Sequence, residues 1–332
     1  MSTEQMKVRY SQLDPTELKK ELIKRYGLSE AISCRFFDFG MNDIYLVNVG
    51  DKKYYLRISL ANMHNKKDYE EETYIIHSLT KHSLPVAAPI ACIDGDFVWE
   101  INAPEGMRYA VLFQEAKNQP SEDSEARNYQ LGETLGRIHQ IADEENFHVS
   151  RLPIDNSTLV ERPLSNLKPY LAHRESDYIF IEASAKASYA FIQQHLKVEK
   201  PYYGFCHGDI HNGNVFFVEN TPQIFDFDCM GYGYRVYDLC TYLWNETFQN
   251  EDYKDSKEWK ALLNGYNSIR KLSDNELSSV TAFAALRELW MMGLHADVMD
   301  RNAGCTWYND GYFDYQIGIF KLWFHRWEKG IR

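Results

Sequence analysis

The sequence has too few basic residues for a protein that binds polyanions over a broad surface. Its 332 residues include 36 Lys and Arg against 48 Asp and Glu, which gives a formal charge of −12. Binding to nucleic acids and adsorption to anionic membranes both depend on cationic surface, so we exclude both as leading functions. No apolar run approaches the roughly 20 residues of a membrane-spanning helix, and no apolar signal segment follows the first residues.

Cysteine is also scarce and scattered. The six cysteines include no CxxC pair, so we expect reduced thiols in a cytoplasmic protein and neither a disulfide framework nor a zinc knuckle. Apolar side chains are plentiful, because 44% of the residues are hydrophobic and 14% are aromatic. This composition excludes a disordered or fibrous chain, and the length fits two ordinary domains or one two-lobed domain.

Two kinds of pattern divide the chain near residue 114. Before it, a helix start at Asp14-Pro15 is followed by segments rich in β-branched and aromatic residues, with one helical pattern among them. The predicted strands are Cys34–Phe39, Asp43–Val49, Lys53–Ser59, Ala88–Ile93, Phe97–Ile101 and Arg108–Phe113, and the helix is Lys67–Lys81. We therefore expect a small antiparallel-sheet lobe over residues 1–114.

Helical periodicity dominates the remaining residues, 115–332. Apolar residues recur on one face from about Asp123, and Ser273 and Glu276 form a capping box. Further predicted helices are Ser176–Leu196, Val236–Glu246, a helix from Ser273 to about Val298, and Tyr315–Trp327. Together the two patterns predict an α+β fold with a sheet lobe and a larger helical lobe.

One non-helical segment, Phe205–Asp228, interrupts the helical lobe and carries a pattern of polar residues. Phosphoryl transfer needs an acidic group to accept the proton of an attacking hydroxyl, and oxygen ligands that hold Mg²⁺ against the nucleotide phosphates. Asp209 and Asn214 have the five-residue spacing of a kinase catalytic loop, and Asp226 follows on the next predicted hairpin. The segment therefore indicates phosphotransfer chemistry.

His-Gly-Asp-x-His-x-x-Asn at 207–214, followed by Asp-Phe-Asp at 226–228, resembles the aminoglycoside phosphotransferase and choline kinase-like families, relatives of the protein kinases. The resemblance implies a bilobal protein-kinase-like fold and a kinase that uses ATP or GTP with Mg²⁺. It also implies a role for each matching residue. These are Asp209 as catalytic base, Asn214 and Asp226 as magnesium ligands, Asp228 as a further metal contact or a neighbour of the metal ligands, His207 and His211 as loop-orienting residues, and Asp238 as the residue that fastens the loop.

The same resemblance places nucleotide contacts in residues 1–114. Gly40 and Asn42 occupy the phosphate-covering turn, although a full glycine-rich loop is absent. Arg57 stands where kinases carry a lysine, and the two side chains are not interchangeable. The ion-pairing glutamate corresponds to Glu72, although Glu70 and Glu71 precede it directly. Phe113 and Glu115 lie in the segment that resembles the adenine-binding hinge.

The acceptor is expected to be a small molecule with a hydroxyl group. Only a short stretch separates Asp228 from Asp238, where a protein kinase has a long activation segment. Residues 1–114 carry a net charge of −2 and the rest −10, which favours an amino-bearing or cationic acceptor. Aminoglycoside, choline, homoserine and sugar-like acceptors remain open, as does the oligomeric state. The alternatives are a serine/threonine protein kinase and a nucleotide-binding pseudokinase.

Aromatic residues are dense near the C-terminal end of the chain and allow two interpretations. They could stack on a sugar or enclose a cationic amine, or they could form the core of the helical lobe. The residues are Trp290, Trp307, Tyr308, Tyr312, Phe313, Tyr315, Trp323 and Trp327.

Overall fold

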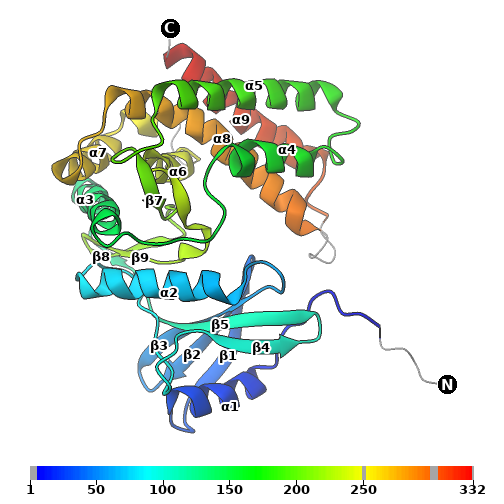
Figure 1. Ribbon diagram of the computed structural model, residues 1–332, viewed down its shortest axis with the longest axis vertical. Helices are drawn as coiled ribbons and strands as arrows, with labels where there is room; N and C mark the ends of the chain where they lie inside the picture. The colour runs from blue at the N-terminus through cyan, green and yellow to red at the C-terminus, as the bar shows by residue number, and fades with distance from the viewer. Residues whose placement is uncertain (1–5, 249–251, 300–305, 331–332) are drawn as a thin grey trace. The chain divides into compact units, whose positions relative to one another are not determined.

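The computed structural model describes residues 6–248, 252–299 and 306–330. The chain divides into two compact units, residues 1–118 with 223–225 and residues 119–222 with 226–332. The first is built on an antiparallel sheet and the second is mainly helical (Figure 1), which confirms the predicted fold class. The division falls after residue 118, a few residues beyond the expected boundary.

The first unit contains a five-stranded sheet in the order β1-β2-β3-β5-β4, and every neighbouring pair is antiparallel. The first three strands lie at predicted positions and form an antiparallel meander, and Gly50 closes its second turn with a φ of 59°, a value that glycine adopts without strain. The strands are β1 (Ser33–Phe39), β2 (Asn42–Val49), β3 (Lys52–Ser59), β4 (Trp99–Ala103) and β5 (Gly106–Gln114).

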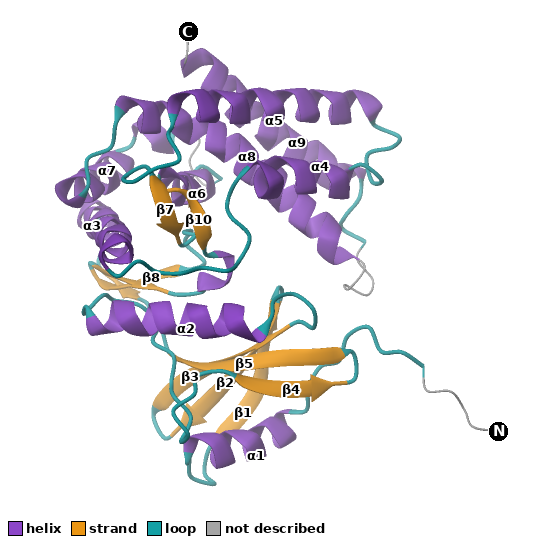
Figure 2. Cartoon of the chain, viewed as in Figure 1, coloured by secondary structure: helices purple, strands orange, loops and turns teal. Residues whose placement is uncertain are grey.

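Two helices, α1 (Pro15–Tyr26) and α2 (Lys66–Lys81), cover opposite faces of this sheet (Figure 2). Asp14 caps α1 as predicted, because its carboxylate accepts a hydrogen bond from the Thr16 amide at 2.8 Å. Leu18 and Leu22 then pack into the larger core of the unit. Helix α2 contributes Tyr69 to a smaller cluster on the other face.

The prediction of a strand over Ala88–Ile93 is wrong. The segment runs beside β5 and makes separate hydrogen bonds, from the Ile90 amide to the Leu112 carbonyl and from the Gln114 amide to the Ala88 carbonyl. Beyond Ile90 the Cys92 amide donates to the Asp96 carbonyl at 2.8 Å, and β4 pairs with β5 from Ala110 to Gly106. The hydrogen bonds from the segment to β5 therefore end at Ile90, and no strand forms.

The second unit contains the predicted long helices and several short elements that the sequence patterns did not predict. Its strands form a two-stranded sheet, β10-β7, and a three-stranded sheet, β6-β8-β9, whose last strand ends in the first unit. The strands are β6 (Gln119–Pro120), β7 (Tyr203–Cys206), β8 (Val215–Glu219), β9 (Thr221–Ile224) and β10 (Gly231–Tyr234). The helices are α3 (Ser124–Glu144), α4 (Arg162–Leu167), α5 (Glu175–His195), α6 (Val236–Glu246), α7 (Lys257–Ile269), α8 (Asp274–Val298) and α9 (Asp310–Gly330).

Helices α3 and α7 approach each other closely because each has a glycine at the crossing. A Cβ atom on Gly132 would overlap the carbonyl oxygen of Leu262, and one on Gly265 would overlap that of Tyr129. Any larger residue would force the two helices apart.

Helix α8 passes through the interior of the second unit and begins at the predicted capping box of Ser273 and Glu276. In the described part of the chain, no helix is both long and apolar enough to cross a membrane. The cysteines there are free thiols, and Cys305 lies outside the described residues.

Candidate active site

The predicted catalytic segment connects β7 to the β8–β9 hairpin. Gly208 lies in this loop with a φ of 82°, and a Cβ atom at this position would overlap the carbonyl oxygen of Cys229. Backbone conformation and space both require glycine here. The loop at residues 207–214 therefore lies directly against the turn at residues 226–229.

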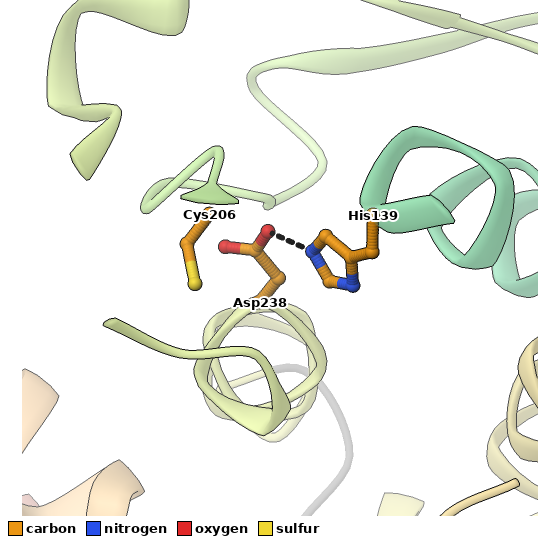
Figure 3. A group of neighbouring side chains, drawn as sticks. All are labelled: His139, Cys206 and Asp238. Atoms are coloured by element: carbon orange, nitrogen blue, oxygen red, sulfur yellow. Dashed lines mark hydrogen bonds and ion pairs between the residues drawn. The ribbon is translucent and has the colours of Figure 1, made fainter. Parts of the chain in front are cut away.

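Asp238, in the first turn of α6, holds the backbone of this loop. Its two carboxylate oxygens accept hydrogen bonds from the amides of His207 and Gly208, each at 2.8 Å. A third hydrogen bond joins the carboxylate to Nε2 of His139 at 3.0 Å (Figure 3). Burial lowers the pKa of His139, so its imidazole is neutral at pH 7 and donates from Nε2. The loop is thus fixed by a fully buried, fully hydrogen-bonded carboxylate.

His139, Cys206 and Asp238 form the only group of His, Cys, Asp and Glu ligand atoms, within the described residues, that is compact enough to surround a metal ion. Both nitrogens of His139 are already hydrogen-bonded, because Nδ1 lies 2.8 Å from the Tyr266 hydroxyl. Burial also raises the pKa of the Cys206 thiol well above its usual value, and metals bind the thiolate. We therefore interpret the group as a hydrogen-bonded support for the loop.

The carboxylate of Asp209 is held at both oxygens. Oδ1 forms an ion pair with Arg287 of α8, while Oδ2 accepts a hydrogen bond from Asn214 at 3.1 Å and lies 3.5 Å from His211. Burial acts to raise the pKa of Asp209, but the Arg287 charge and the His211 hydrogen bond outweigh it and hold the pKa well below its usual range. Since 16% of the side chain is exposed, an ionised carboxylate is accessible to a small hydroxyl compound.

Asn214 and His211 are oriented by the same loop. The Asn214 amide nitrogen donates to the Asp209 backbone carbonyl at 3.0 Å and to the Asp209 carboxylate. Because both hydrogen bonds use the nitrogen, the side-chain oxygen is the Asn214 atom that could bind a cation. His211 accepts a hydrogen bond from the Gly213 amide at 2.9 Å.

Asp226 and Asp228 lie on the turn that follows β9. Asp226 has a φ of 61°, a left-handed conformation that is sparsely populated outside glycine and often marks functional sites. Asp228 contacts Arg151, which donates to its backbone carbonyl at 2.5 Å and lies 3.5 Å from its carboxylate. Burial raises the pKa of the nearby Cys229 thiol, and the charges of Asp209, Asp228 and Asp226 raise it further. The negative charges of these three carboxylates therefore act on this thiol.

The donor set fits a hard divalent cation. The side-chain oxygen of Asn214 and the carboxylate of Asp226 are the kind of ligands that Mg²⁺ prefers. They lie on the two loops that Gly208 and Cys229 bring together, in a region with excess negative charge. Asp228 is engaged by Arg151, so it is better placed to shape the turn than to bind metal directly.

In the first unit, Arg57 of β3 and Glu72 of α2 form a buried ion pair. Their closest atoms lie 2.7 Å apart, and the two residues are 5% and 0% exposed. The Arg57 guanidinium also lies 5.0 Å from the centre of the Phe113 ring. The neighbouring Glu70 and Glu71 lie instead within 4 Å of lysines of their own helix. Glu72 is therefore the glutamate that pairs with Arg57.

The other expected nucleotide contacts lie in the same unit. The Gly40 amide donates to the Asn42 carbonyl at 3.0 Å and closes the turn between β1 and β2. A Cβ atom on Gly40 would meet nothing within 4 Å, so packing does not require glycine there. Glu115 follows β5 and lies 3.5 Å from Lys53. The binding roles of these residues stay predictions.

The aromatic residues near the C-terminal end serve two different purposes. One group is buried in the core of the second unit: Phe313, Trp323 and Trp327. Another group forms a cluster of ring contacts around His295: Trp307, Tyr308 and Tyr312. Trp307 is 45% exposed and Tyr315, which belongs to neither group, is 61% exposed, so aromatic surface is available to a ligand at these residues.

Sequence reasoning missed two arginines that contact the predicted site residues. Arg287 pairs with Asp209, and Arg151 contacts the turn of Asp228. Arg287 lies in the apolar stretch Ala282–Trp290, and a charged residue within such a stretch indicates a buried ion pair. That signal was present, but it did not identify the partner.

Comparison with known proteins agrees with this architecture. An uncharacterized protein of Synechocystis is 33% identical over 296 residues, which cover 87% of this chain and 80% of that protein. The structure of an amicoumacin kinase in complex with AMP-PNP, Ca²⁺ and Ami superimposes with a TM-score of 0.75 at 19% identity, covering 95% of this chain and 94% of that one. A microcompartment-associated aminopropanol kinase superimposes with a TM-score of 0.70 at 18% identity, covering 96% and 98%.

These structural likenesses show a shared fold, and the sequence match is more specific. The family model described as "Phosphotransferase enzyme family" matches residues 37–272. That range includes β2, β3 and the end of β1 in the first unit, and the loops that carry Asp209, Asn214 and Asp226. The chain therefore belongs to the phosphotransferase enzyme family, of aminoglycoside phosphotransferase type.

Proposed function

We propose that the protein is a kinase that transfers the γ-phosphate of ATP or GTP to a hydroxyl group of a small molecule, with Mg²⁺ as the metal. One observation carries the proposal. The partly buried, ionised carboxylate of Asp209 shares a hydrogen bond with Asn214, on a loop that packs against the turn of Asp226. This geometry supports Asp209 as the proposed proton acceptor and Asn214 and Asp226 as the proposed oxygen ligands, the groups that phosphoryl transfer requires.

In the proposed reaction, Asp209 accepts a hydrogen bond from the acceptor hydroxyl and orients its oxygen toward the γ-phosphorus. The new oxygen–phosphorus bond forms as the bond to the leaving nucleoside diphosphate breaks, and the hydroxyl proton passes to the carboxylate. The low pKa of Asp209 means that proton transfer comes late, when the hydroxyl has become acidic. Orientation is therefore the larger part of its contribution.

Asn214 and Asp226 would hold the magnesium ion through their side-chain oxygens. The bound ion supplies positive charge that offsets the charge on the nucleotide phosphates. Asp238, His207 and His211 set the loop that carries these groups.

The proposed nucleotide contacts in the first unit are Gly40, Asn42, Arg57, Phe113 and Glu115. Arg57 is the cation among them, and Glu72 orients its guanidinium. Because Arg57 also stacks on the Phe113 ring, its reach is more restricted than that of a flexible lysine.

We propose a small acceptor because the short stretch between Asp228 and Asp238 is occupied by β10, which pairs with β7. The stretch between these two residues therefore has no room for the long activation segment with which protein kinases bind polypeptides. Two structurally similar proteins are an amicoumacin kinase and an aminopropanol kinase. The acidic excess in residues 115–332 supports an acceptor that carries an amino group. We place the protein in the cytoplasm, where nucleoside triphosphate and reduced thiols are both available.

The proposal is tested by measuring ADP release from Mg²⁺–ATP against aminoglycosides, amino alcohols, hydroxy amino acids and sugars. A generic protein substrate is included. We expect turnover with at least one small acceptor, and a loss of about 10²- to 10⁴-fold in Asp209→Asn with nucleotide affinity retained. Tight nucleotide binding without turnover on any acceptor would favour the pseudokinase, and phosphorylation of the protein alone would favour a protein kinase.

A further inference from the structure

Arg287 lies in the middle of the buried helix α8 and is only 1% exposed. A permanently charged guanidinium in such a position requires a partner. Within the described residues, its one ion pair joins Nη2 to Oδ1 of Asp209, the carboxylate proposed to receive the acceptor hydroxyl. The ion pair thus connects an interior helix directly to the reacting group.

Aromatic side chains restrict the guanidinium from two directions. It lies 4.2 Å from the centre of the Trp290 ring and 5.2 Å from that of Trp244. Both rings favour a cation over their faces. Trp244 is itself fixed, because its indole nitrogen donates to the fully buried Glu288 at 2.9 Å. The guanidinium position is therefore set by packing and does not depend on Asp209 alone.

The Asp209 carboxylate is held on its other side by the catalytic loop. Asn214 donates to Oδ2 at 3.1 Å, and His211 lies 3.5 Å from the same atom. A carboxylate held at one oxygen can still rotate about its terminal bond, because that torsion has a broad energy minimum. Contacts at both oxygens, from two different elements, remove this freedom.

We infer that Arg287 is a positioning residue that fixes the orientation of the Asp209 carboxylate for attack by the acceptor hydroxyl. The inference rests on the proposed kinase function. Arg287 contributes no proton and makes no proposed contact with the nucleotide. Its loss should therefore lower kcat while the KM for ATP stays near the wild-type value.

Arg287→Met removes the charge and keeps much of the side-chain volume. Because small errors in the placement of a reacting group cost about 10²-fold, we expect kcat to fall about 100-fold. Arg287→Lys retains a cation that can reach one oxygen but lacks the planar fork of arginine. We therefore expect its kcat to be about tenfold higher than that of Arg287→Met and about tenfold lower than that of the wild type. If the methionine variant does not fold, the lysine variant still tests the inference through its lower kcat and unchanged KM.

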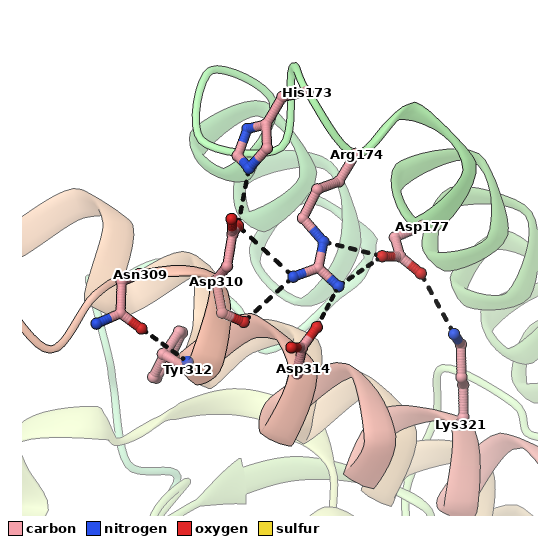
Figure 4. A network of polar contacts seen from close by, with 8 residues as sticks. All are labelled: His173, Arg174, Asp177, Asn309, Asp310, Tyr312, Asp314 and Lys321. Atoms are coloured by element: carbon pink, nitrogen blue, oxygen red, sulfur yellow. Dashed lines mark hydrogen bonds and ion pairs between the residues drawn. The ribbon is translucent and has the colours of Figure 1, made fainter.

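Arg174→Met is the matched control for the loss of a structural ion pair. Arg174 joins α5 to α9 through Asp177 and Asp314 (Figure 4), and it does not contact the residues of the proposed site. We expect its kcat to equal that of wild type, even if its melting temperature falls.

Each outcome supports or overturns the inference. Wild-type turnover with a large kcat loss in Arg287→Met, partial rescue by lysine and no loss in Arg174→Met supports it. If the wild type turns over and kcat is unchanged in Arg287→Met, the inference is overturned and the kinase proposal stays intact. The same holds if the variant has an unchanged kcat but a higher KM for ATP, which would make Arg287 a nucleotide contact. A wild-type protein without turnover overturns both.

Discussion

Replacing Asp238 by asparagine tests whether one buried carboxylate holds the loop at residues 207–214. The substitution keeps the shape of the side chain but exchanges one acceptor oxygen for an NH₂ group. If the remaining oxygen accepts from the Gly208 amide, the NH₂ group faces the amide of His207 and the ring of His139. Neutral His139 can change tautomer and accept a hydrogen bond, whereas the His207 amide cannot.

The expected cost follows from this count. One buried backbone amide loses its partner, which costs about 1–3 kcal/mol. The retained hydrogen bonds also lose their ionised acceptor, and charge-assisted bonds are roughly twice as strong as neutral ones. We therefore expect Asp238→Asn to lower the free energy of unfolding by about 2–4 kcal/mol.

Urea unfolding followed by tryptophan fluorescence measures this loss, and hydrogen exchange locates it. The amide of His207 should exchange much faster in the variant, and kcat should fall because Asp209 follows the same backbone. Asp51→Asn, in the exposed turn between β2 and β3, is the control and should change neither quantity. A variant as stable as wild type, with unchanged exchange at His207, would refute the reasoning.

Three further predictions concern packing and charge. Gly265→Ala should destabilise the protein by about 1–3 kcal/mol, because the new Cβ atom would overlap the Tyr129 carbonyl oxygen. Gly318→Ala in α9 is the control: its Cβ atom would meet nothing within 4 Å, so it should stabilise the protein by up to about 1 kcal/mol. Equal melting temperatures of the two variants would contradict this prediction. Burial raises the pKa of Glu288 from 4.5, its value in the unfolded chain, to about 8 in the folded protein. The contribution of Glu288 to the free energy of unfolding is therefore fully present below pH 4.5 and is lost as the pH rises through 8. Glu288→Gln should remove this fall between pH 5 and 9, which unfolding at several pH values measures, and a parallel pH dependence in both proteins would disprove it. Arg108→Met should lower the free energy of unfolding by about 3–5 kcal/mol, because Arg108 is buried and donates to the Asp43 carboxylate and to the carbonyls of Ser59 and Ser11. Urea unfolding measures this loss, with Lys20→Met on the exposed face of α1 as the control. A smaller loss in Arg108→Met than in the control would be evidence against the prediction.

Local sequence patterns predicted most of the long elements. The cap at Asp14, the capping box at Ser273 and the glycine turn at Gly50 each act within a few residues, so the helix and strand that they limit can be read from the chain. The segment Ala88–Ile93 has the composition of a strand, but β4 pairs with the same edge of β5, and no local pattern reveals that competition. Short elements such as α4 and β10 depend on contacts with distant residues and gave no local signal.

The sequence by itself determined the order of Asp209, Asn214 and Asp226, and it predicted phosphotransfer from their spacing, because these residues lie within one short segment. The family resemblance pointed to Glu72 and to Asp238, and the structure shows the ion pair of Glu72 with Arg57 and the hydrogen bonds of Asp238 to the loop at residues 207–214. Only the tertiary structure decided that Arg287 reaches Asp209 from a helix 78 residues further along the chain. Such an ion pair forms between atoms that packing brings together, so the partner of Arg287 is a property of the fold.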